Sequence, residues 1–120
     1  MKKFDILKKI PYRKVTTEHE SIDLYSLGNF NGSTYELIEL PKGYAAKPHI
    51  HKYSEATLHF IFGSGKILIG NKWSDYKKED TFFIPKDTKH GFKVDEDSLF
   101  LSVNTPGIID KKTGKVDVEY

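Results

Sequence analysis

The chain has 120 residues, the length of one ordinary domain built around a continuous core. Its 19 basic and 17 acidic residues nearly cancel and are interspersed, which gives no basic face for nucleic acid. The chain has no cysteine, so disulfides and thiolate metal ligands are excluded, and a metal must be held by histidine, carboxylate or tyrosine oxygen.

The N-terminal segment, MKKFDILKKIPYRK, holds no long apolar run. We therefore expect neither a signal peptide nor a membrane span, and we place the protein in the cytoplasm. Within this segment, KKFDILKKI fits either a short helix or an edge strand. His19, in the polar run TTEHES, is assigned no role.

From about residue 21 the chain consists of short apolar or alternating segments: SIDLYSL, STYELIEL, AAKPHIH, ATLHFIF, KILIG, a stretch around WSDYK, TFFIP, HGFKV and LFLSV. Turn-forming residues separate them, among them Gly63-Ser64-Gly65, Gly70-Asn71, Pro85-Lys86-Asp87 and Asp95-Glu96-Asp97. Short strands at this spacing predict an all-β sandwich or barrel rather than a βαβ sheet. ATLHFIF is apolar on both faces, which predicts a central strand. The tail IDKKTGKVDVEY predicts a polar turn followed by a short strand or an ordered arm.

Two of the five histidines lie close together in PHIHKYSE, residues 48–55. Side chains alternate along a strand, so His49 and His51 would point the same way, about 6.5–7 Å apart. That spacing suits a metal ion or one small substrate. It also suits two histidines that merely share a strand face.

A third histidine follows in EDTFFIPKDTKHGF. A strand ends at Pro85, a tight turn follows, and His90 opens the next strand, where it shares a face with Phe92 and Val94. That face is apolar, so we expect it to point inward. A histidine there can be a ligand in a dry cavity or a buried ring bonded to a carbonyl.

The order and spacing of these groups resemble the two motifs of the cupin family. The first, Gly, five residues, His-x-His, three or four residues, Glu, six residues, Gly, is matched here by Gly43, His49, His51, Glu55 and the turn FGSG. The second, Gly, five residues, Pro-x-Gly, two residues, His, three residues, Asn, is matched by Glu79, Pro85-Lys86-Asp87 and His90, with Val94 in place of Asn. In this turn Asp87 tolerates the positive φ that a glycine would otherwise supply.

The resemblance covers roughly residues 33–104 and implies one cupin-like domain over 1–120, with the terminal segments as edge strands or arms. The implied fold is a double-stranded β-helix, an antiparallel jelly-roll barrel. It would bring His49, His51 and His90 together in one mouth, where many relatives hold a divalent ion such as Fe, Mn, Ni, Zn or Cu. By analogy of fold we also expect a homodimer, with KKFDILKKI or DVEY as candidate arms.

The carboxylate of the family site does not align cleanly. Six residues before Gly63 stands Ala56, and strand parity then turns Glu55 outward. A bulge or a tighter turn would let Glu55 face the ion as a fourth ligand. Three neutral imidazoles alone would still suit Fe, Ni, Cu or Zn and leave positions open for substrate.

Further residues are candidates for a substrate pocket at the barrel mouth. Pockets are mainly apolar with a few placed polar groups, and plain core packing explains the apolar candidates nearly as well. We expect His59 to face outward and Trp73 to pack or to meet a partner. The pocket candidates are Tyr35, Tyr44, Lys47, Leu58, Phe60, Phe62 and Phe92.

These residues favour a metal-dependent enzyme acting on a small molecule, by dioxygenase, isomerase or lyase chemistry on a sugar or small acid. The first alternative is a non-catalytic binding module for a sugar or metabolite. The second is a metal-independent nucleotide-sugar isomerase or epimerase with a mouth histidine as base. A diphosphate needs basic residues, and Arg13 is the only arginine, although lysines could substitute.

Overall fold

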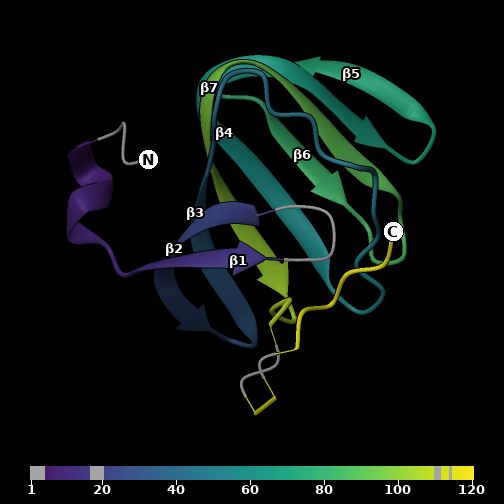
Figure 1. Ribbon diagram of the computed structural model, residues 1–120. Helices are drawn as coiled ribbons and strands as arrows, with labels where there is room; N and C mark the ends of the chain where they lie inside the picture. The colour runs from purple at the N-terminus through teal and green to yellow at the C-terminus, as the bar shows by residue number, and fades with distance from the viewer. Residues whose placement is uncertain (1–4, 17–20, 110–111, 114) are drawn as a thin grey trace.

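The computed structural model describes residues 5–16, 21–109, 112–113 and 115–120 (Figure 1). Its elements are η1 Asp5–Lys9, a 3-10 helix, and the strands β1 Tyr12–Thr16, β2 Ser21–Phe30, β3 Ser33–Leu40, β4 Glu55–Ile69, β5 Lys72–Tyr76, β6 Thr81–Ile84 and β7 His90–Thr105. All strand pairs are antiparallel, in the order β1-β2-β3-β7-β4-β5, and β6 pairs with β4. The predicted all-β antiparallel barrel is confirmed.

Of the segment expected as a short helix or an edge strand, the described part forms the 3-10 helix η1, and the edge strand β1 begins only after it, at Tyr12. His19 lies outside the described residues. Within the described part of the chain, no helix is long and apolar enough to cross a membrane.

Strands β4 and β7 lie side by side and curve together around the molecule (Figure 1). The predicted turns at 63–65 and 95–97 are wrong, because both segments lie inside these long strands. Their turn-forming residues bend the strands instead of reversing them. The register shifts three times between Phe60 and Gly65, which is how bulged strands curve into a barrel.

Hydrophobic residues pack in two clusters, one on each face of the sheet. The larger one fills the barrel and includes Leu58, Phe60, Phe92 and Phe100. The smaller one lies where Leu7 of η1 packs with Tyr25, Leu37 and Leu99, with Ile61 of β4 against it. Strand β4 is therefore covered on both faces and paired with three strands, which confirms the prediction for ATLHFIF.

Gly63 permits the close crossing of β4 and β7 at the bend. Its φ is +100°, and a Cβ there would lie 2.6 Å from Asp97 O and from Ser98 Cα. Both contacts are with backbone, so neither atom can move aside without shifting β7. Only glycine fits this position without strain.

We predict that Gly63→Ala lowers the free energy of unfolding by roughly 3 kcal/mol, through the disfavoured φ and the backbone clash together. Gly28→Ala is the matched control, because Gly28 has φ +120° with nothing within 4 Å of an added Cβ. It should cost only about 1 kcal/mol. Urea denaturation measures both, and equal losses would contradict the clash at Gly63.

Candidate metal centre

The segment that carries His49 and His51 runs along the start of β7. His49 N–H donates to His90 O at 3.0 Å, and His90 N–H donates to His49 O at 2.9 Å. The predicted strand AAKPHIH forms only isolated bridges here, because Pro48 has no N–H to extend a ladder. This antiparallel bridge brings the two halves of the site together.

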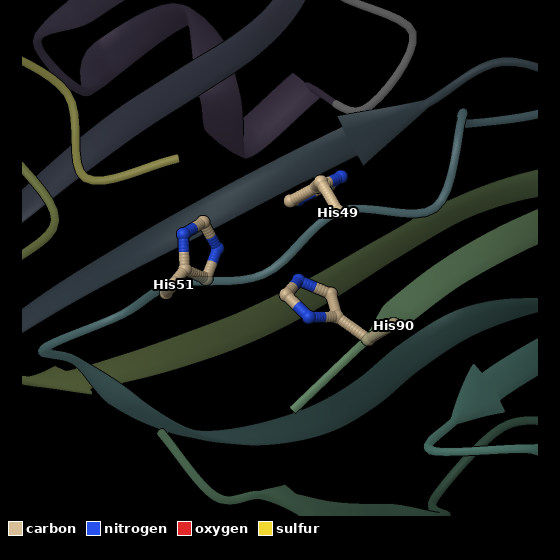
Figure 2. A group of neighbouring side chains, drawn as sticks. All are labelled: His49, His51 and His90. Carbon is tan, nitrogen blue, oxygen red and sulfur yellow. The ribbon is translucent and has the colours of Figure 1, made fainter. Parts of the chain in front are cut away.

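His49, His51 and His90 each offer a ring nitrogen, and these three atoms lie within 4.8 Å of one another. Figure 2 shows the rings gathered around one space. The ring centroids are 5.2 Å apart for His49 and His51, 4.4 Å for His49 and His90, and 4.8 Å for His51 and His90. His49 and His90 are buried and His51 is half-buried. One ion could contact all three rings.

Each ring is oriented by a backbone carbonyl at Nδ1. His49 Nδ1 lies 3.1 Å from Lys47 O, and His90 Nδ1 lies 3.2 Å from Thr88 O. His51 Nδ1 bonds to Asp117 O. A carbonyl only accepts, so each Nδ1 carries the hydrogen, and in the neutral ring the lone pair is on Nε2. Metal-binding histidines are fixed in this way by the bond of their other nitrogen.

The environment favours the neutral form of His90. Burial above all, and the charges of His49 and His51 beside it, lower the pKa of its ring to about 3, although the hydrogen bond to Thr88 opposes this shift. A neutral imidazole is the form that binds a metal. The uncharged ring also allows three imidazoles to lie this close together.

The C-terminal segment completes the site, and sequence reasoning missed its role. Besides the bond from His51, Asp117 accepts hydrogen bonds at its carboxylate from the backbone N–H groups of Lys52, Tyr53 and Ser54, at 3.0–3.1 Å. Residues Ile50 and Glu119 exchange two further backbone bonds of 2.7 and 2.9 Å. The ordered arm expected at the C-terminus is therefore a wall of the site. The available signal was alternation, with apolar Val116 and Val118 on either side of Asp117.

The three histidines open into a cavity of about 70 Å³. Its walls are mainly apolar side chains from β3, β4, β7 and the C-terminal segment. Among the expected pocket residues, three line it: Tyr44, Leu58 and Phe92.

The other four expected pocket residues do not line this cavity. Phe60 is fully buried and stacks on Tyr76 with ring centroids 3.9 Å apart. Phe62 is 43% exposed, because the bulge after Phe60 reverses the strand parity. Lys47 is exposed, with Nζ 5.6 Å from the ring centroid of Tyr120. Tyr35 alternates with the inward residues of β3 and lies outside the lining.

The structure places Ala56, and not Glu55, toward the histidines. Ala56 is buried and lines the cavity, whereas Glu55 is exposed. Glu55 as a possible fourth ligand is thus corrected in favour of the regular parity that turns it outward, because the bulges of β4 begin only after Phe60 and leave residues 55–60 regular. His59 faces away from the site, and its Nδ1 lies 2.7 Å from Thr81 Oγ1.

A curved antiparallel barrel with histidines from two sequence motifs at its mouth defines a class of small β-barrel proteins. The family model described as "Cupin domain" matches residues 36–104. The chain therefore belongs to the cupin family. No curated protein matches the sequence.

Solved structures share this fold at low sequence identity. A predicted oxalate decarboxylase from Thermotoga maritima is 17% identical with a TM-score of 0.71, over 83% of this chain and 96% of that one. KdgF from Halomonas sp. is 18% identical with a TM-score of 0.71, over 82% and 90% of the two chains. A cupin 2 conserved barrel domain protein from Rhodopseudomonas palustris is 19% identical with a TM-score of 0.70, over 81% and 72%. At such low sequence identities, the similarity to these structures shows a shared fold alone.

We predict that metal-free protein loses stability as the pH falls from about 6.5 toward about 3. In that window His90 takes up a proton when unfolded but not when folded, so the free energy of unfolding rises with pH. His90→Gln should flatten this part of the urea-denaturation profile. The control, His59→Gln, should leave it unchanged. An identical pH profile in His90→Gln would contradict the burial of a neutral His90.

We predict that Asp117→Ala weakens Zn²⁺ binding roughly tenfold, because the carbonyl that orients His51 is no longer anchored to residues 52–54. Asp97→Ala is the control, since its carboxylate also caps a backbone N–H, that of Lys42, outside the cavity. Competition with a zinc-sensitive dye measures both affinities. Equal Zn²⁺ affinities in the two variants would show that Asp117 does not orient the ligand.

Proposed function

We propose that the protein holds a divalent metal ion at His49, His51 and His90 and binds a small molecule beside it. One observation carries this proposal: the three Nδ1 atoms bond to carbonyls while the three rings offer nitrogens within 4.8 Å of one another. Histidines with a purely structural role would not need to carry their hydrogens on the same ring nitrogen or to offer ring nitrogens to one common point.

The donor set limits the choice of metal. Three neutral imidazoles suit Fe, Ni, Cu and Zn, while Mn prefers oxygen ligands. None of the described residues that line the cavity is a carboxylate, so the ion would keep its full charge and positions open for a ligand. Such an ion would supply Lewis-acid polarisation of a carbonyl or redox chemistry. We therefore favour metal-dependent chemistry of the dioxygenase, isomerase or lyase kind.

The residues around the ion set what such a reaction could use. The backbone carbonyls of Lys47, Thr88 and Asp117 keep the rings in place, and the apolar walls exclude water. Tyr44 forms part of the cavity wall. The protein's own part is to bind, orient and shield a small substrate.

The structure supports the metal-independent nucleotide-sugar isomerase or epimerase less well. A nucleotide sugar needs cations for its diphosphate, and among the described lining residues none is lysine or arginine. A cavity of about 70 Å³ is also far smaller than the 300–1,000 Å³ of ordinary ligand pockets. A non-catalytic metabolite-binding module would use the same site. Only a measurement of substrate turnover distinguishes it from an enzyme. The expected homodimer and the cytoplasmic location stay predictions.

Metal content tests the proposal directly. Protein purified without a chelating tag and incubated with Fe²⁺, Ni²⁺, Cu²⁺ or Zn²⁺ should retain about one ion per chain after desalting. The double variant His49→Ala/His51→Ala should retain none, because one imidazole cannot hold the ion. His59→Ala is the control, since His59 lies outside the group.

Thermal denaturation supplies a second measurement on the same samples. A bound ion at 100 times its Kd raises the free energy of unfolding by about 2.7 kcal/mol, which shifts the melting temperature by several degrees. The shift should appear in the parent and in His59→Ala, and vanish in the double variant. No retained ion and no shift with any of the four metals would refute the metal centre.

A further inference from the structure

A second polar group lies against the same cavity and takes no part in the three-His site. Ser102 and Asn104 of β7 line the cavity and are each 3% exposed. Glu36 of β3 is 8% exposed and lies behind them. Burying a carboxylate, an amide and a hydroxyl inside a small barrel lowers the free energy of unfolding. A functional role for these groups would explain why they are buried.

Hydrogen bonds fix which atoms of this group face the cavity. Asn104 Nδ2 donates to Ser102 Oγ at 3.0 Å and to Glu36 Oε1 at 3.4 Å. Because a carboxylate only accepts, Glu36 sets the amide orientation, and both Nδ2 hydrogens are used. Asn104 therefore presents its acceptor Oδ1, while Ser102 keeps a hydroxyl hydrogen to donate. The pair offers one acceptor and one donor.

The strand register places this pair beside the metal centre. Asn104 lies opposite Ala56, the position that faces the histidines in place of a carboxylate. Ser102 lies opposite Leu58 on one side and Glu36 on the other. Ala56 and Asn104 both line the cavity. A ligand that reaches the histidines would pass this donor and acceptor.

We propose that Asn104 and Ser102 bind a hydroxyl group of a small, uncharged ligand whose other polar atom lies at the three-His centre. The inference rests on the proposed function and names its substrate class. A hydroxyl both donates and accepts, so it satisfies Asn104 Oδ1 and Ser102 Oγ–H together. Among the described lining residues there is no lysine or arginine, so a carboxylate or phosphate remote from the ion would lack a counter-charge.

The state of Glu36 agrees with its positioning role. Burial raises the pKa of its carboxyl, while the charge of Arg13 and the hydrogen bond from Asn104 oppose that rise. A carboxyl kept in the barrel at this cost suits a residue that orients another side chain. Glu36 is thus a positioning residue, and Asn104 and Ser102 are the binding residues.

The test uses Co²⁺-loaded protein and two probes of nearly equal shape. Hydroxyacetone carries a carbonyl and a hydroxyl, whereas butanone has a methyl group in place of the hydroxyl. Changes in the visible Co²⁺ spectrum on titration give both Kd values, and their ratio is the hydroxyl preference. Comparing this ratio between parent and variant removes any preference due to chelation by the ion itself.

Asn104→Leu should reduce the hydroxyl preference about five- to tenfold, the effect of one buried hydrogen bond, with Co²⁺ affinity unchanged within about twofold. Glu36→Gln should reduce it too, because a glutamine amide can donate to Asn104 Oδ1 and occupy it. If Asn104→Leu does not fold, Ser102→Ala replaces it in the same measurement of the hydroxyl preference. Ser98→Ala is the control, a buried β7 serine bonded to Tyr76 at 2.8 Å outside the cavity.

The outcomes separate this inference from the proposed function. Failure of the parent protein to bind Co²⁺ would overturn the metal centre and the inference with it. A Co²⁺-loaded parent with the same hydroxyl preference as Asn104→Leu and Ser102→Ala would overturn the inference alone. So would the absence of any spectral change with 100 mM hydroxyacetone. A loss of preference in both variants but not in Ser98→Ala establishes the subsite.

Discussion

The candidate centre depends on three hydrogen bonds from histidine Nδ1 atoms to backbone carbonyls. For His49 and His90 the acceptor lies two residues back, at Lys47 and Thr88, so the local chain conformation sets the ring. For His51 the acceptor is Asp117, 66 residues further along the chain. These bonds fix the tautomer, and each of the three rings offers a nitrogen within 4.8 Å of the other two. Without them the rings would have no common focus.

The three histidine rings meet at the mouth of a barrel because β4 and β7 bend together. The bulges after Phe60 and the close approach at Gly63 curve the two longest strands, so that the first residue of β7 returns beside His49. The same curvature places Ala56 and Asn104 side by side on the inner face. The fold thus brings together three histidines and a separate hydrogen-bonding pair, in a cavity with no lysine, arginine or carboxylate among its described lining residues.

Much of this was predictable because it depends on local patterns. The His-x-His spacing and the inward face of His90 followed from strand alternation, and the turn at Asp87 takes φ 59° as expected. The bulge in β4 was not predictable, since Gly63-Ser64-Gly65 signals a turn and a bend equally well. Phe62 was misplaced for that reason. The roles of Asp117, Glu36 and Asn104 were not predictable, because the side-chain hydrogen bonds that define them join residues 63 or more positions apart. The bond from Asn104 to Ser102 is the local exception.

Long-range ¹H–¹⁵N NMR correlation of the histidine rings in metal-free protein, above pH 7, tests whether the three hydrogen bonds hold the rings in one tautomer. It reports which nitrogen of each ring carries the hydrogen. We expect His49, His51 and His90 all to hold it on Nδ1, and Zn²⁺ then to shift the three Nε2 resonances together. A ring among the three with its hydrogen on Nε2, or a Zn²⁺ response in fewer than three rings, would contradict it.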